Sequence, residues 1–239
     1  MSWIRRRWKL LVVAAVVAVG IGVVAIPYVY IHFINKPEPR LTFENLDRER
    51  SGESTVAAVA SNDATDGTWT VVAPSTAGYR VKETLNGQDT EGVGRTQTVD
   101  GSFTLVGTDV TNGEFNVDVS SLKSDQSRRD GQVSGRLLET EQFPVATFVL
   151  DQPIALDALP QDGILLSATA SGTLSLHGVE KPVTLSVEAR RNGPVIEVLA
   201  NTVITFADFD IEDPSKAPFV TVGATGTLEV QLTLSRSAA

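Results

Sequence analysis

The chain has 239 residues, of which 42% are hydrophobic and 21% charged, and it contains no cysteine. This length allows one medium or two small domains, and the apolar content supports a packed core, which excludes general disorder. The lack of cysteine excludes disulfide scaffolds, thiolate metal sites and cysteine nucleophiles. The net charge of −9 argues against a nucleic-acid partner, because proteins that bind nucleic acid need a basic face.

Residues 1–9 and 10–34 have the pattern of a membrane anchor. The first segment carries Arg5, Arg6, Arg7 and Lys9 without an acid, and the second has 25 residues without Asp, Glu, Lys or Arg. A helix of that length covers about 37 Å, more than the ~30 Å of a bilayer core. We therefore predict a cytoplasmic basic segment over 1–9 and a transmembrane helix over 10–34, with the rest of the chain extracytoplasmic at the cell membrane.

A cleaved signal peptide is the alternative interpretation of this segment. The apolar region of a signal peptide normally has about 7–15 residues and ends in a small-residue cleavage site. Here the apolar run is longer, and Tyr28, Val29, Tyr30 and Ile31 fill the stretch where cleavage would occur. The pattern therefore favours an uncleaved anchor.

Residues 35–65 mix proline, charge, serine and alanine without a sustained period. Pro37 and Pro39 favour extended chain in this segment and in the residue before each of them. We predict a linker that tethers the next domain and holds it off the membrane. A short interfacial piece around Leu41, Thr42 and Phe43 is an open alternative.

Residues 66–239 have a different pattern, which consists of short runs of alternating apolar and polar residues separated by Gly, Pro, Asp-Gly or Asn-Gly. Such alternation predicts antiparallel strands with one apolar face, with hairpins at Asn112-Gly113 and Asn192-Gly193. The predicted strands cover 68–71, 78–82, 102–105, 115–119, 146–150, 173–176, 183–187, 195–199 and 227–234.

One helix is predicted within this domain, from Ser124 to about Thr140, with Ser124 or Asp125 as the N-cap. Gly92-Val93-Gly94 is assigned to an acidic loop. The fold class is all-β, either a closed barrel or a sandwich. Closure is favoured because it removes exposed edges, and an eight-stranded barrel has room for one small ligand.

A search for catalytic motifs finds no nucleophile elbow, P-loop or zinc-protease helix. We predict no catalytic residue, no metal and no cofactor. His177 is interpreted as a hydrogen-bonded turn residue, with ligand contact as the alternative. Asp208, Asp210, Glu212 and Asp213 lack EF-hand spacing, so we interpret them as solvated loop charge.

Arg128-Arg129-Asp130 on the predicted helix has two interpretations. One is a set of surface salt bridges, each of which contributes little to stability. The other is a cationic mouth for an anionic headgroup, which arginine suits through its forked donors.

Five segments in order carry a resemblance to a known family. They read DGTWTV, GYRVK, SRRDG, QFPVATF and, most specifically, GTLSLHGVEKPVTLSV. Together they resemble the YceI-like family of polyisoprenoid-binding, lipocalin-like barrels, and the anchor followed by YIHFI resembles a membrane-tethered branch of actinobacteria. The resemblance implies an eight-stranded antiparallel barrel with one helix, which binds an isoprenoid chain in its lumen and has no established enzymatic activity.

The chain departs from this family at three places where many relatives have histidine. Pro74, Glu83 and Gln132 stand there, so a polar role of those histidines does not carry over. The apolar wall does carry over, on strands that match the family. The residues expected to contact a ligand are Tyr79, Val81, Phe103, Leu105, Phe115, Val117, Phe148, Leu174 and Leu176.

The function that these features indicate is a membrane-tethered, extracytoplasmic lipid-binding protein that carries or sequesters an isoprenoid or similar amphiphile. Two alternatives remain open. The barrel interior could be filled by side chains, which would indicate a structural or interaction module of the cell envelope. An enzyme would need a polar site around His177 or the acids of 208–213. A hollow apolar lumen, open at one rim, distinguishes the first interpretation; the oligomeric state is not predicted.

Overall fold

The computed structural model describes residues 37–52, 65–85, 87–216 and 220–237. Its helices and strands are α2 (Phe43–Gly52), β1 (Gly67–Leu85), β2 (Gln88–Thr96), β3 (Val99–Val106), β4 (Asp109–Asp118), β5 (Lys123–Ser124), α3 (Ser127–Gln132), β6 (Val145–Leu150), β7 (Ile154–Ala155), β8 (Leu166–Leu176), β9 (Val179–Asn192), β10 (Val195–Thr205) and β11 (Val220–Arg236). Short helical turns lie at Val119–Ser121, Val133–Leu137, Phe206–Phe209 and Pro214–Lys216.

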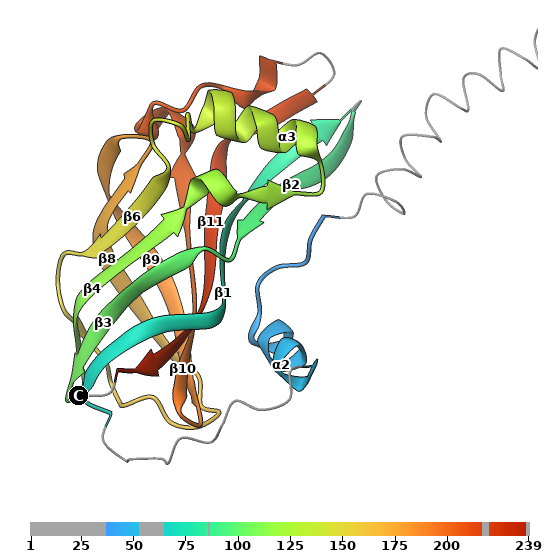
Figure 1. Ribbon diagram of the computed structural model, residues 1–239. Coiled ribbons are helices and arrows are strands. Elements are labelled where there is room, and N and C mark those ends of the chain that lie inside the picture. Colours follow the sequence, from blue (N-terminus) through green and yellow to red (C-terminus); the bar gives the residue numbers. More distant parts are fainter. Residues whose placement is uncertain (1–36, 53–64, 86, 217–219, 238–239) are drawn as a thin grey trace, which may run out of the picture.

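Eight antiparallel strands close into a barrel (Figure 1). Their order around the ring is β1, β3, β4, β6, β8, β9, β10 and β11, and β11 returns to pair with β1 along most of its length. The start of β1 pairs with β3, whereas its second half leaves β3 and pairs with β2, where Tyr79 opposes Gly94. The eight-stranded barrel is therefore confirmed, and the sandwich alternative is wrong.

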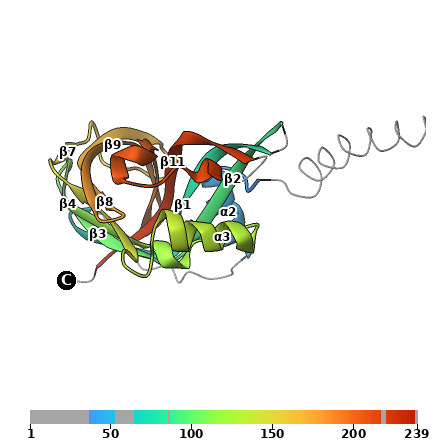
Figure 2. The same cartoon turned by 90° about the horizontal axis from the view of Figure 1, so that it is seen from above.

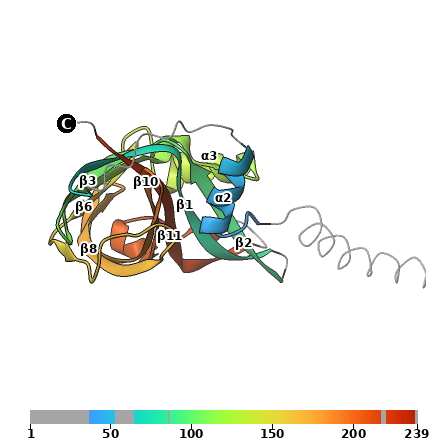
Figure 3. The same ribbon diagram turned by 90° about the horizontal axis from the view of Figure 1, so that it is seen from below.

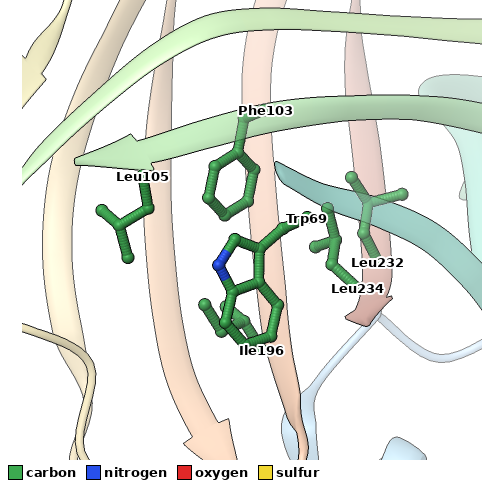
Figure 4. Packing of buried hydrophobic residues seen from close by; sticks show 6 residues of the cluster. All are labelled: Trp69, Phe103, Leu105, Ile196, Leu232 and Leu234. Carbon is green, nitrogen blue, oxygen red and sulfur yellow. The ribbon is translucent and has the colours of Figure 1, made fainter. Parts of the chain in front are cut away.

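One end of the barrel is closed by a packed cluster (Figure 4). Trp69 lies at its centre with 2% of its surface exposed, and its indole Nε1 donates to the carbonyl oxygen of Thr65 over 2.9 Å. The cluster fills the interior between β1, β3, β10 and β11 near the C-terminus and is formed by Trp69, Phe103, Leu105, Ile196, Leu232 and Leu234. This is the end that we call the closed end.

The opposite end carries α3 and the short helices of residues 206–216 (Figures 1 and 2). The helix predicted over 124–140 is shorter, with α3 continued by a π-helical turn to Leu137. Gln126, and not Ser124 or Asp125, takes the N-cap position. Ser124 instead binds Asp130 through its backbone N–H (2.8 Å) and its hydroxyl (2.6 Å), which ties the start of the helix to β5.

Three local predictions are wrong. Asn112-Gly113 is no hairpin, because it lies inside β4 at a bulge opposite Phe103, where Asn112 has a φ of +51°. The real hairpin between β3 and β4 turns at Gly107 and Thr108. Gly92-Val93-Gly94 belongs to strand β2 and not to a loop, and the runs 68–71 and 78–82 are parts of one long strand. The hairpin at Asn192-Gly193 is confirmed.

Residues 37–52, which we call the strap, differ from the free tether predicted over 35–65. Residues 43–52 form α2, which lies outside the ring of strands (Figure 3). Glu38 and Asp47 of the strap bind the barrel wall through ion pairs. The predicted basic segment 1–9 and membrane helix 10–34 lie outside the described residues. Among the helices of the described part, none is long and apolar enough to cross a bilayer.

Candidate functional site

An apolar cavity of about 590 Å³ occupies the barrel interior. This volume lies within the range of about 300–1,000 Å³ that is typical of small-molecule sites. Every one of the eight barrel strands contributes alternate residues to its wall, as the two-residue period of a strand requires. On β8, for example, Leu166, Ala168, Ala170, Leu174 and Leu176 line the cavity.

The interior is hollow, and small side chains are the reason. Ala168, Ala170, Ala189 and Ala200 point inward at places where a larger residue would fill the lumen. Large inward residues such as Phe115 are only half-buried, because they face open space instead of a packed partner. The structure therefore does not have the filled interior that the structural-module alternative needs.

All nine residues predicted to contact a ligand lie on the wall of this cavity. Phe103 and Leu105 line it next to the closed end, where they also belong to the cluster around Trp69. That these residues touch a bound molecule stays a prediction. The prediction omitted the opposite wall, although its strands show the same alternation; that wall is formed by Val183, Leu185, Val187, Val198, Leu228 and Val230.

The polar part of the cavity lies at the α3 end, which we call the mouth. Gln126, Arg128, Arg129 and Gln132 of this helical region line it. Among all residues of the lining, Arg128 and Gln132 are the two that are exposed to solvent, so the cavity meets water here. The opening therefore lies under α3, opposite the closed end.

The two arginines of the mouth differ in their partners. Arg129 donates to Glu83 Oε2 over 3.0 Å through Nη2 and pairs with Asp125 through Nη1. Arg128 takes part in none of the ion pairs found among the described residues. Of the two interpretations of this pair, the salt bridge holds for Arg129, whereas Arg128 keeps its charge available at the opening.

Tyr79 adds a neutral polar group below the mouth. Burial raises the pKa of its phenol well above the usual value, and the nearby Glu83 carboxylate adds to this, while Arg129 acts in the opposite direction. The Tyr79 ring lies over Gly94, its cross-strand partner, where a Cβ would collide with the ring. Glu83 and Gln132 both line the cavity, whereas Pro74 does not.

His177 and Glu212 of the 208–213 segment have partners elsewhere in the fold. His177 lies in the turn between β8 and β9, where Nδ1 donates to the carbonyl oxygen of Phe209 over 3.0 Å. It is therefore the hydrogen-bonded turn residue that the sequence indicates. Glu212 pairs with Arg136 at 3.2 Å. Within the described ranges, no three His, Cys, Asp or Glu residues gather closely enough to hold a metal ion.

Comparison with known proteins identifies the family of this barrel. The YceI-like domain model matches residues 69–234, which is more than half of the chain and includes all eight strands of the ring apart from two residues at each outer end. The chain belongs to the YceI-like family. No match is found among curated proteins.

Two solved structures share the fold of this YceI-like barrel. A polyisoprenoid-binding domain from Saccharophagus degradans, implicated in plant cell wall breakdown, is 18% identical with a TM-score of 0.58, and the match covers 72% of this chain and 100% of that one. BcnA from Burkholderia cenocepacia is also 18% identical, with a TM-score of 0.54, over 68% of this chain and 98% of that one. At this identity the likeness establishes the fold of the YceI-like barrel.

Proposed function

We propose that this YceI-like protein binds an isoprenoid or a similarly elongated amphiphile in its barrel cavity, beside the outer surface of the cell membrane. The observation that carries the proposal is the hollow apolar cavity, closed around Trp69 and polar only at the mouth. A second support is the relative from Saccharophagus degradans, which is itself a polyisoprenoid-binding domain.

Burial of the chain supplies the binding energy. Each buried CH₂ contributes about 0.8 kcal/mol, so a hydrocarbon tail needs no covalent step to be held. A tail directed toward Trp69 leaves its polar end beside Arg128 and Gln132. An arginine without an acidic partner favours an anionic head, such as a phosphate. The protein acts in this proposal as a carrier and not as an enzyme.

The membrane anchor is the part of the proposal that depends on the sequence. Residues 10–34 have the length and composition of a spanning helix, and the basic residues of 1–9 favour a cytoplasmic N-terminus. An anchored barrel stays close to the membrane that contains its lipids, which raises the effective concentration of the ligand.

Native mass spectrometry of the full chain, purified from its host in mild detergent, tests the proposal. We expect one prenyl or acyl species in near-stoichiometric amount. The Ala168→Phe variant, which fills the lumen, separates cavity ligand from lipid around the anchor, because only the former is lost. A wild-type chain that carries no such species, also after incubation with polyprenyl phosphate, would refute the carrier function.

A further inference from the structure

Residues 38 and 39, the upper part of the strap, are held on the outer barrel wall by a network of charges around two largely buried arginines. Arg80, with 4% of its side chain exposed, donates to the Glu38 carbonyl oxygen over 2.9 Å and to Glu91 over 2.7 Å. Arg95 pairs with Glu38 Oε2 at 3.0 Å and with Glu229 at 2.9 Å, and it also binds the carbonyl oxygen of Pro39. Residues 38 and 39 are therefore fixed to β1, β2 and β11.

The lower part of the strap binds a second place on the wall. Asp47 of α2 pairs with Arg190 of β9 at 2.5 Å, and the Phe43 ring lies 4.7 Å below the same guanidinium. Arg190 in turn holds Glu197 of β10 at 2.6 Å, and this outward-facing carboxylate is completely buried. Leu46 is also completely buried. Two separate contacts thus fix the direction of the strap.

This direction runs from the mouth to the closed end. Pro37 shares a hollow of the surface with β1, β2 and β11, and two residues of that hollow, Glu83 and Val222, also line the main cavity at the mouth. Lower on the strap, α2 contacts Arg190 of β9, and the partner of Arg190 on β10, Glu197, directly follows Ile196 of the closed end. Figure 1 shows the same course, from the level of β2 down to α2.

We propose that the strap turns the mouth of the barrel toward the bilayer, so that lipid passes between membrane and cavity without crossing bulk water. This inference rests on the anchor in the proposed function. Only Asn35 and Lys36 lie between position 34, where the apolar segment ends, and Pro37, which makes three steps from one Cα to the next. Extended chain spans at most about 11 Å over that separation, so the rim beside Pro37 is kept at the membrane surface.

Charge on the rim does not by itself explain such an orientation. The hollow beside Pro37 carries Lys82 together with Glu83, Asp89 and Glu91. Attraction to anionic lipid needs a cluster of basic residues, which is worth about 1 kcal/mol for each cation near the surface. The ion pairs of the strap therefore carry the orientation, and the partner of the rim is the bilayer that contains residues 10–34 of this same chain.

Energy transfer from single labels to the bilayer tests this orientation in the full chain, in nanodiscs that contain acceptor-labelled headgroups. The chain has no cysteine, so a label can be placed at Ser127→Cys beside the mouth or at Thr108→Cys in the turn of the closed end. An 11-residue strand such as β8, tilted by about 40°, separates the two ends by about 28 Å. We expect strong transfer at position 127 and weak transfer at 108.

Three variants examine the cause. Glu38→Ala with Asp47→Ala removes the two side-chain ion pairs of the strap, whereas the carbonyl contacts of residues 38 and 39 and the packing of Phe43 and Leu46 remain. This variant is expected to reduce the difference in transfer between the two positions. Glu44→Ala with Arg48→Ala removes an exposed pair that faces away from the barrel and is expected to keep the difference. Ten Gly and Ser residues inserted between Asn35 and Lys36 leave the strap bound but lengthen the link, so the difference is expected to vanish.

Equal transfer at both positions of the wild-type chain, or stronger transfer at 108, would overturn the orientation. So would a strap variant that folds and keeps the full difference. A chain that does not remain with the nanodiscs would refute the anchor, and the orientation with it. Loss of the lipid in native mass spectrometry, with the label difference intact, would instead refute only the carrier function.

Discussion

Arg129 Nη2 lies 3.0 Å from Glu83 Oε2, and this contact joins α3 to the second half of β1 across the mouth of the barrel. The carboxylate has 9% of its side chain exposed and the guanidinium 15%, so water screens the pair only weakly. Because α3 has no buried residue of its own, the ion pair is a principal attachment of this helix.

Glu83→Gln is expected to loosen the helix at the mouth. Glutamine keeps the shape but replaces a charge-assisted hydrogen bond by a neutral one, which weakens the contact by about 1 kcal/mol. Amide hydrogen exchange in residues 127–137 should accelerate about fivefold. Lys82→Gln, the exposed neighbour, should leave exchange unchanged, and equal protection in both variants would contradict the role of the Arg129–Glu83 ion pair in holding α3.

Ala168→Phe is expected to abolish lipid binding without loss of stability. A bulky residue destabilises a packed core by about 1–3 kcal/mol, but here the ring enters open space and buries its own apolar surface. Thr169→Phe places the same ring on the outer face of β8 and should keep binding. Thermal unfolding together with lipid titration checks both, and binding that survives in Ala168→Phe would exclude this cavity as the site.

Trp69→Ala is expected to destabilise the barrel by about 3–5 kcal/mol, because it removes the centre of the closed end. Trp69→Phe should cost less, mainly the hydrogen bond from Nε1 to Thr65, which is worth about 0.5–1.5 kcal/mol. Val203→Ala, at a site that is 65% exposed, serves as the control and should change stability by no more than about 0.5 kcal/mol. Denaturant unfolding followed by circular dichroism measures all three.

The raised pKa of Tyr79 is expected to lower the free energy of unfolding in alkaline solution. The folded barrel raises the pKa of its phenol above the ordinary value of 10.0, so the folded state holds this proton more tightly than the unfolded chain does. The Tyr79 phenol therefore contributes its full share to the free energy of unfolding below pH 10. This share decreases as the pH rises above 10, by at most about 1.4 kcal/mol for each pH unit. Tyr79→Phe should decline less steeply; identical slopes of unfolding free energy against pH would contradict this role.

Sequence patterns predict the barrel wall well because its information is local. Alternate residues of a strand face one side, so Leu174 and Leu176 could be assigned to the same face before any contact was known. Strand β2 could not be predicted from the sequence, because its centre, Gly92-Val93-Gly94, resembles a loop. Glycine is required at position 94 because the Tyr79 ring of the neighbouring strand lies against it. This contact between strands cannot be predicted from the local sequence.

The course of the strap depends on contacts between distant parts of the chain. Glu38 meets Arg95 across 57 positions, and Asp47 meets Arg190 across 143. Before folding, these residues have the appearance of ordinary solvated charge among prolines and serines. Similarly, Asn112-Gly113 has a strong hairpin signal, but the pairing of β4 with β3 on both sides of it makes it a bulge.

The inward alanines allow the size of the barrel lumen to change through single substitutions. Because Ala168, Ala170, Ala189 and Ala200 lie on strands whose pairing does not depend on side-chain size, each of them can be exchanged for valine or leucine while the outer surface stays the same. Each exchange shortens or narrows the lumen by one or a few carbon atoms. The length of the ligand that fits the lumen would thus change over a few mutations, while the strap and the closed end remain untouched.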